Sequence, residues 1–77
     1  MPISVKIFAS LREAVPDAAP RVDAVAHDTV ADVWHRATGG ASMPDHVLCS
    51  INLEHRRAED VVSDGDEVAF FPPVTGG

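Results

Sequence analysis

The sequence predicts an α+β fold in which one main helix lies on one face of a mixed sheet. Three observations predict it. Residues 3–7 and 67–71 have the apolar pattern of half-buried strands. Residues 30–37 have apolar side chains at helical spacing. The chain has 77 residues, which is enough for a single small domain. One helix packed on one sheet is therefore the arrangement that buries both apolar faces.

The first third of the chain is predicted to form two antiparallel strands. Apolar and polar residues alternate over 3–7, and a weaker strand pattern covers 21–26. Between them, 10–15 has helix-forming residues and ends at Pro16, which favours a short helix or turn. Residues 17–20 then form a loop that joins the two strands.

The main helix is predicted over 30–37. Its apolar residues recur at i, i+3, i+4 and i+7 from Val30 to Ala37. Either Asp28 or Thr29 is expected to cap it, because each side chain can accept a hydrogen bond from a free N–H of the first turn. The glycine pair 39–40 is expected to end it.

The second half of the chain is predicted to add three strands. Residues 47–51 alternate as a third strand, and the polar stretch 52–60 encloses a short edge strand around His55. The Asp-Gly-Asp sequence at 64–66 indicates a turn, and 67–71 follows as the last strand.

Charge and composition exclude several classes of partner. Six Lys and Arg stand against twelve Asp and Glu, which gives a net charge of −6. Nucleic acids and anionic membranes are bound through Lys and Arg, so we expect neither as a partner. No apolar run approaches the roughly 18 residues of a membrane span, and no signal peptide is expected after Met1. We therefore expect a cytoplasmic protein.

Cysteine and histidine give no sign of a metal or nucleophile site. Cys49 is the single cysteine and lies on the apolar face of the third predicted strand, so we interpret it as a small buried hydrophobic residue. The four histidines have no i, i+4 pairing and are expected to be surface or structural residues. A cluster of carboxylates is expected to form a solvated rim or, alternatively, an electrostatic docking surface: Glu59, Asp60, Asp64, Asp66 and Glu67.

The C-terminus is the unusual part of the chain. We divide the sequence into a domain over 1–71 and a tail over 72–77. Two prolines stiffen the start of the tail, whose six residues reach about 19 Å in a polyproline-like form. Its last two residues are glycines, which pass through a channel too narrow for other side chains. The pattern favours a terminal carboxylate that enters another protein's active site, and the alternative is an ordinary frayed terminus.

The last fourteen residues, Asp64 to Gly77, resemble the C-terminal signature of the molybdopterin synthase small subunits, the MoaD-type ubiquitin-like sulfur carriers. Residues 5–13 are similar to the family's first strand and turn more loosely, and Ile51-Asn52 stands where its third strand ends. His55 stands where an apolar residue is expected. The resemblance implies a ubiquitin-like β-grasp, in which the first and last strands pair in parallel at the centre of the sheet.

The resemblance also implies a mechanism. An E1-like adenylyltransferase uses ATP to adenylate the carboxylate of Gly77, and a sulfur-donor enzyme converts it to a thiocarboxylate. The large synthase subunit then takes up the tail, and the sulfur passes to cyclic pyranopterin monophosphate to build the dithiolene of molybdopterin. The small subunit is a non-catalytic sulfur donor in a heterotetramer and binds no cofactor stably. The alternatives are a carrier for thiamine-thiazole synthesis and a ubiquitin-like modifier joined to lysines of other proteins.

Strand phase predicts where partners dock. If the alternate residues Ile3, Val5 and Ile7 face the core, Phe8 faces outward, and the same reasoning turns Phe71 outward. Parallel pairing would place both rings on one face near the tail, which is an interface signal unless one ring turns into the core or the tail covers it. Arg12 is expected to pair with a partner carboxylate or, alternatively, with Glu13 or Asp17. The residues expected to bind partners are Phe8, Arg12, Phe71, Pro72, Pro73, Val74, Thr75 and Gly76, and Gly77 is expected to carry the sulfur.

Overall fold

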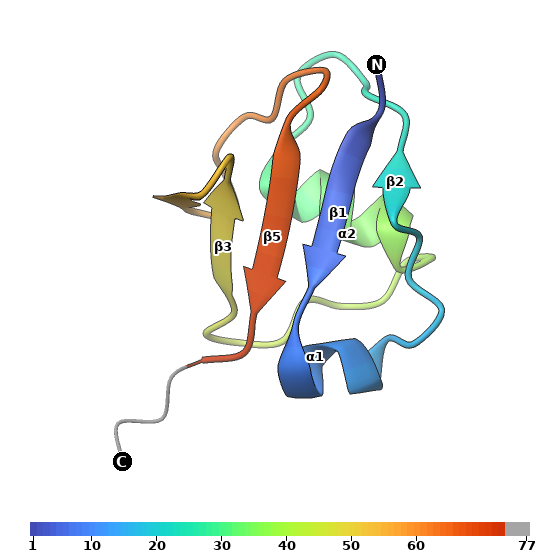
Figure 1. Ribbon diagram of the computed structural model, residues 1–77, viewed down its shortest axis with the longest axis vertical. Coiled ribbons are helices and arrows are strands. Elements are labelled where there is room, and N and C mark those ends of the chain that lie inside the picture. The colour runs from blue at the N-terminus through green and yellow to red at the C-terminus, as the bar shows by residue number, and fades with distance from the viewer. Residues whose placement is uncertain (74–77) are drawn as a thin grey trace.

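Five strands form one mixed sheet, and α2 packs on one of its faces (Figure 1). The fold is seen in a computed structural model that describes residues 1–73. The elements in chain order are β1 (Ile3–Ile7), α1 (Ala9–Ala14), β2 (Arg21–Val22), α2 (Val30–Ala37), β3 (Leu48–Ile51), β4 (Glu54–Arg56) and β5 (Glu67–Phe71). The predicted α+β class is confirmed.

The first and last strands lie at the centre of the sheet. The strand order is β2-β1-β5-β3-β4, and β1 pairs with β5 in parallel, with Val5 opposite Val68 and Ile7 opposite Phe70. The other three pairings, β1 with β2, β3 with β5 and β3 with β4, are antiparallel. The parallel pairing that the family resemblance implies is therefore confirmed.

The core lies between α2 and the inner face of the sheet. Val30, Val33, Trp34 and Ala37 are buried on the helix, as their spacing predicts. The ring of Trp34 meets that of Phe70 edge to face, with centroids 4.9 Å apart and planes at 69°. This geometry is preferred between aromatic rings, so the pair ties the helix to the central strand.

The ends of α2 follow the sequence signals. The Thr29 side chain accepts a hydrogen bond from the Asp32 N–H at 3.2 Å, and the Asp32 carboxylate accepts one from the Thr29 N–H at 3.0 Å. This reciprocal capping box satisfies two N–H groups of the first turn. After the helix, Gly39 and Gly40 have φ values of 69° and 97°, a region that glycine adopts without strain.

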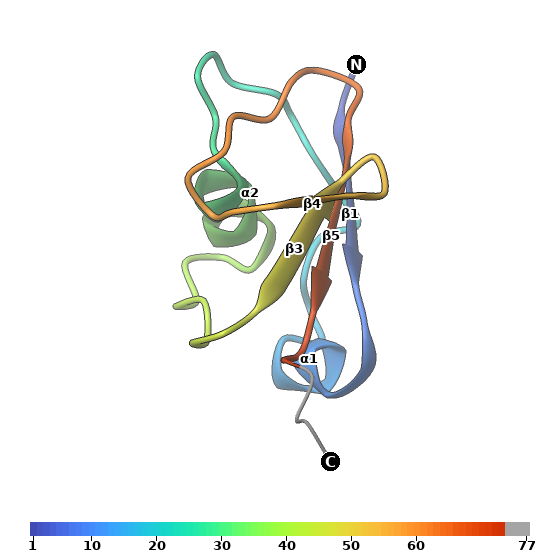
Figure 2. The same cartoon turned by 90° about the vertical axis from the view of Figure 1, so that its left-hand side faces the viewer.

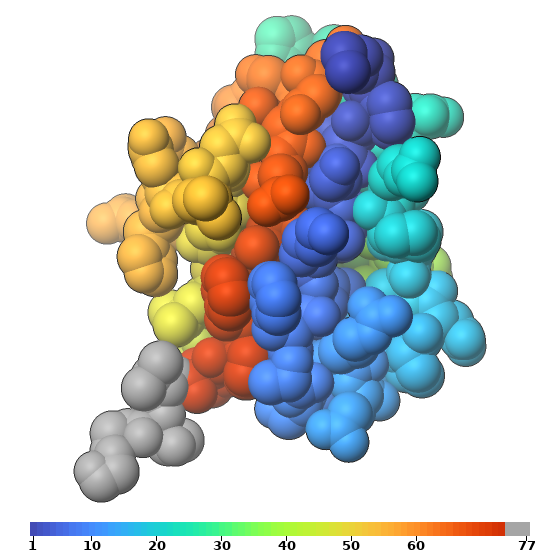
Figure 3. Space-filling model, viewed as in Figure 1, coloured from blue at the N-terminus to red at the C-terminus, as the bar shows by residue number. Residues whose placement is uncertain are grey.

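The outer face of the sheet carries no helix of the described chain. Figure 2 shows α2 on one side of the sheet, while α1 lies at the end where β1 and β5 finish. Figure 3 looks directly onto the other side, where β1, β5 and the β3–β4 hairpin lie exposed next to one another. Their outward side chains are thus left without a covering layer from residues 1–73.

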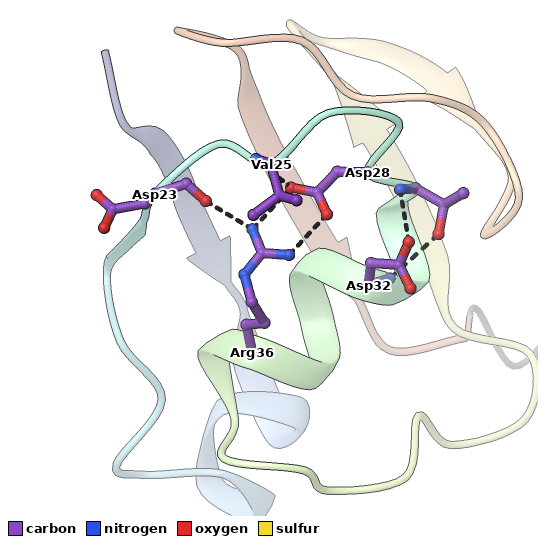
Figure 4. Close-up of polar contacts among 6 residues, drawn as sticks. Asp23, Val25, Asp28, Asp32 and Arg36 are labelled. Carbon is purple, nitrogen blue, oxygen red and sulfur yellow. Dashed lines mark hydrogen bonds and ion pairs between the residues drawn. The ribbon is translucent and has the colours of Figure 1, made fainter.

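The second strand is shorter than predicted, because an ion pair organises the residues that follow it. The prediction of a strand over 21–26 is wrong beyond Val22. The Arg36 guanidinium donates two hydrogen bonds to the Asp28 carboxylate at 2.6 and 2.7 Å and a third to the Asp23 carbonyl oxygen at 2.7 Å (Figure 4). The Asp28 carboxylate also accepts from the Val25 N–H at 2.9 Å. These groups are bonded to one another rather than to a neighbouring strand.

Asp28 is therefore not the cap of α2, although its position before the helix made it a candidate; its side chain instead binds Arg36. Its side chain is only 4% exposed, and hydrogen bonding to Arg36 holds the pKa of its carboxyl below the ordinary value, against the opposing effect of burial. The same bonds raise the pKa of Arg36. The pair fixes the loop before α2 onto the last turn of that helix.

The remaining boundaries differ from the predictions by one residue. The short helix covers 9–14 instead of 10–15, and the third strand starts at Leu48 instead of Val47. The edge strand around His55 and the turn at 64–66 are confirmed, and Gly65 has a φ of 83° in that turn. Neither helix that the structure describes has the length and apolar character that crossing a bilayer requires.

Candidate functional site

The paired ends of β1 and β5 place two phenylalanine rings side by side on the outer face. Ile7 lies opposite Phe70 in the parallel register, so the next residues, Phe8 and Phe71, are adjacent. Their rings stack with centroids 4.9 Å apart and planes within 4°. Phe8 is 44% exposed and Phe71 is half-buried. The predicted outward phase is confirmed, and the alternative in which one ring turns into the core is wrong.

This stack forms one wall of a groove, which we call the exit groove. It has a volume of about 510 Å³. Pro72 also lines it, so the chain leaves β5 at the edge of this groove. The rest of its lining comes from Ala9, Leu48, Ser50, Leu53 and His55.

Beside the exit groove, one row of side chains crosses four strands of the outer face. In the pairing register, Lys6 lies next to Ala69, Ala69 next to Ser50 and Ser50 next to His55. Ala69 and Ser50 are 4% and 8% exposed, although no described helix covers them. Because these two residues are small, the longer side chains around them shield them from solvent and make a depression in the face.

Arg12 forms no ion pair with the described part of the chain. It is exposed in the last turn of α1, and no ion pair within residues 1–73 involves it. The alternative of a local salt bridge with Glu13 or Asp17 is therefore wrong. Pairing of Arg12 with a partner carboxylate stays a prediction.

The predicted carboxylate cluster is used largely to shape turns. Asp64 pairs with the terminal ammonium of Met1 at 2.6 Å. The side chains of Asp60 and Asp66 accept hydrogen bonds from backbone N–H groups three residues earlier, at 2.8 Å each. These contacts give Asp60, Asp64 and Asp66 a local structural role, while an electrostatic docking surface that includes Glu59 and Glu67 stays a prediction.

Cys49 is buried and the histidines lie at the surface. Cys49 is buried in the core, as predicted, and burial raises the pKa of its thiol, which keeps the sulfur protonated and weakly nucleophilic. All four histidines are exposed. Within the part of the chain that the structure describes, no three His, Cys, Asp or Glu side chains gather into a possible metal site.

The tail residues fall partly outside the structure. Pro72 is half-buried and Pro73 exposed. The predicted partner-binding residues Val74, Thr75 and Gly76, and the predicted sulfur carrier Gly77, lie outside the described residues. Their roles, and the division into a domain over 1–71 and a tail over 72–77, stay predictions.

Comparison with known proteins gives the family. Residues 5–77 match the ThiS family. The chain belongs to the ThiS family. This ThiS-family chain is 37% identical to the molybdopterin synthase sulfur carrier subunit of Escherichia coli over 97% of its own length and 99% of that protein. It is 31% identical to small archaeal modifier protein 1 of Haloferax volcanii, over 94% of its own length and 97% of that protein.

Solved structures agree with the fold of this ThiS-family chain. A crystal structure of the same Haloferax volcanii modifier covers all of both chains with a TM-score of 0.72 at 29% identity. A second crystal structure of that protein covers 95% of this chain and 98% of the other with a TM-score of 0.70. The predicted ubiquitin-like β-grasp is thereby confirmed.

The sequence patterns do not point to four residues that line the exit groove, namely Ala9, Leu48, Ser50 and Leu53. Leu48 and Ser50 have the outward phase of β3, but the interpretation of that strand concerned its inward residues. Leu53 lies within 52–60, whose polar composition predicts a turn. The signal that locates it is the two-residue spacing between Ile51 and Glu54, with Asn at its first position, which is typical of a tight hairpin.

Proposed function

We propose that this protein is the sulfur-carrier subunit of a molybdopterin synthase. In this role Gly77 is adenylated, converted to a thiocarboxylate and used as the sulfur donor in forming the dithiolene of molybdopterin. The proposal combines the chain's similarity to the Escherichia coli sulfur carrier subunit with the geometry at the end of β5.

The observation that carries the proposal is the position of the chain exit. β5 is the central strand of the sheet, Phe71 at its end stacks on Phe8, and Pro72 follows in the exit groove. A partner that takes up the tail therefore meets an exposed aromatic pair at its base. Aromatic residues are enriched at protein interfaces and among the residues that dominate binding energy.

The chemistry assigns separate tasks to the chain and its partners. A carboxylate is a poor electrophile, and adenylation gives it a leaving group by attack on the α-phosphate of ATP with loss of pyrophosphate. Sulfur at the oxidation level of sulfide, delivered by a sulfur-donor enzyme, then attacks the acyl carbon, displaces AMP and leaves a thiocarboxylate, whose sulfur is the nucleophile for the pterin. The E1-like adenylyltransferase binds the ATP and the large synthase subunit binds the pterin, so this chain needs no stably bound cofactor. Its cytoplasmic location and assembly as a heterotetramer stay predictions.

A second candidate is a protein modifier whose Gly77 is joined to lysines of other proteins. The similarity to small archaeal modifier protein 1, in sequence and in solved structure, favours it. Both candidates use an activated C-terminal carboxyl, and they differ in the nucleophile that attacks it. A carrier for thiamine-thiazole synthesis is the remaining alternative within the carrier class.

Intact-mass spectrometry of the protein purified from its own cells tests the proposal. A sulfur carrier gives a population whose mass has gained the difference between sulfur and oxygen, and this gain disappears when Gly77 is deleted. A modifier instead gives conjugates with an isopeptide-linked Gly77 remnant on lysine. Conjugates without any thiocarboxylate would contradict the proposal and favour the second candidate.

A further inference from the structure

The β3–β4 hairpin carries an exposed leucine in a backbone conformation that leucine rarely adopts. Ile51 pairs with Glu54, so Asn52 and Leu53 form a two-residue hairpin loop. Their φ values are 51° and 71°. Loops of this kind favour Asn followed by Gly, because both residues must lie in the left-handed region. Leu53 occupies the position where glycine is the usual residue.

Asn52 compensates for its conformation and Leu53 does not. The Asn52 side chain donates to the Asp66 carboxylate and accepts from the Glu67 N–H, both at 2.9 Å, which anchors it to β5. Leu53 has an apolar side chain that is 87% exposed. It thus gains little from burial within residues 1–73, and its backbone conformation is unfavourable. A strained residue of this kind indicates a role outside the folding of the domain itself.

Leu53 stands opposite the aromatic stack. It lines the exit groove together with Phe8 and Phe71, and Ser50 lies between these walls as a small residue. Of the described residues that line the groove, none carries a carboxylate, although the chain has twelve Asp and Glu. Its ionisable side chain is His55, and Lys6 lies in the same row across the outer face. The groove is therefore an apolar site with basic groups beside it on a protein of net charge −6.

The position of the chain exit identifies the occupant. Pro72 lines the groove, and the six residues from Pro72 to Gly77 span at most about 20 Å when extended. Any protein that holds the terminal carboxylate in its active site therefore lies within that distance of the groove. The groove that Leu53 and the Phe8–Phe71 stack line is therefore within reach of such a protein.

We propose that Leu53 is an anchor for the large synthase subunit, which inserts a bulky apolar side chain, with a carboxylate beside it, into the exit groove between Leu53 and the Phe8–Phe71 stack. This inference rests on the proposed function, since it takes the large subunit as the protein that receives the tail. It adds a specific residue and the chemistry of the partner surface. The contact with the large subunit would explain why leucine stands at a position whose φ of 71° favours glycine.

The test uses Leu53→Gly and Leu53→Met in the full-length chain, with affinity for the large subunit measured by calorimetry and the melting temperature measured on the free protein. Leu53→Gly removes the anchor and gives the hairpin the residue that its φ favours. We expect its affinity to fall about tenfold or more, while its melting temperature stays equal or rises by a few degrees. Leu53→Met keeps an apolar side chain and is expected to bind within about threefold of the parent.

The outcomes separate the two proposals. If the parent binds and Leu53→Gly binds equally well, the inference is wrong and the proposed function stands. If Leu53→Gly loses affinity and also melts at a lower temperature, Leu53 is a structural residue and the inference is again wrong. If sedimentation shows that the chain alone forms dimers that Leu53→Gly abolishes, the groove holds a second copy instead. Failure of the parent to bind the large subunit contradicts the proposed function and this inference together.

Discussion

Replacing Phe8 or Phe71 by alanine is expected to weaken partner binding with little loss of fold stability. The two rings stack on the outer face with centroids 4.9 Å apart, and Phe8 is 44% exposed. Neither ring belongs to the buried core cluster. Each substitution removes the aromatic contact, which contributes roughly 0.5–1.5 kcal/mol beyond burial. For a domain of this size, about 1 kcal/mol lowers the melting temperature by about 4–8 °C.

The expected effect on binding is larger. An aromatic residue that becomes buried at the centre of an interface typically costs about 2 kcal/mol or more when truncated. That corresponds to a roughly 30-fold increase in Kd. Isothermal titration calorimetry with the large subunit measures the affinity, and differential scanning calorimetry of the free chain measures the stability.

The neighbouring Phe70 is the matched control. It is fully buried and meets Trp34 edge to face, so Phe70→Ala is expected to cost about 3–5 kcal/mol of stability. That is a large part of the roughly 5–15 kcal/mol that holds a native domain together. The reasoning is refuted if Phe71→Ala behaves like this control, with a large drop in melting temperature and an unchanged Kd for the folded fraction.

Three further predictions concern residues outside the aromatic stack. Arg12→Glu is expected to weaken large-subunit binding at low salt by about tenfold, and the difference in Kd should shrink as added salt screens the charges. If the variant binds as tightly as the parent at every salt concentration, Arg12 does not pair with a carboxylate of the partner. Cys49→Ser is expected to lower the free energy of unfolding by about 1–3 kcal/mol, because it buries a hydroxyl. The variant should still form the Gly77 thiocarboxylate as fully as the parent, and loss of thiocarboxylate in the folded variant would indicate a persulfide relay through Cys49. Asp28→Asn is expected to lower the free energy of unfolding by about 2 kcal/mol at pH 7. This difference from the parent should shrink as the pH falls through the lowered pKa of Asp28, because protonation then breaks the ion pair of the parent as well. Urea unfolding at neutral and acid pH measures that difference, and a pH-independent deficit would contradict the assignment.

The sequence predicted those elements whose signals are local. The alternation over 3–7 and the helical spacing over 30–37 each reflect burial of one face, and both elements appear as expected. The outward phase of Phe8 and Phe71 followed from the same alternation, once the parallel pairing of the two strands was supplied by the family resemblance.

The errors lie where a contact distant in sequence decides the local structure. Residues 23–26 belong to the predicted strand over 21–26, but the Arg36 guanidinium on α2 binds the Asp23 carbonyl and the Asp28 carboxylate. No periodicity within 21–26 contains that information. Because the Asp28 carboxylate is bonded to Arg36, Thr29 caps the helix instead.

The second wall of the exit groove was missed for a related reason. Leu53 belongs to the groove because a tight hairpin folds β4 back beside β3 and leaves the loop next to the start of β5, on the face that the groove crosses. The polar composition over 52–60 masks Leu53, and the φ values of 51° and 71° identify the loop as the tight hairpin that Asn52 at its first position favours.

The central claim is that the carboxylate of Gly77 is the reactive group of this protein, and changing the chain length by one residue tests it most directly. The protein is prepared with Gly77 deleted, with one residue added after it, and unchanged, and each is incubated with the activating enzyme, ATP and a sulfur donor. One residue moves the terminus by roughly 3.3 Å, and a misplacement of about 1 Å can already cost 100-fold in rate. We expect mass spectrometry to detect thiocarboxylate on the unchanged chain and almost none on the other two, with equal melting temperatures for all three. Equal charging of the shortened and extended chains would contradict the claim, since the sulfur would then be carried elsewhere.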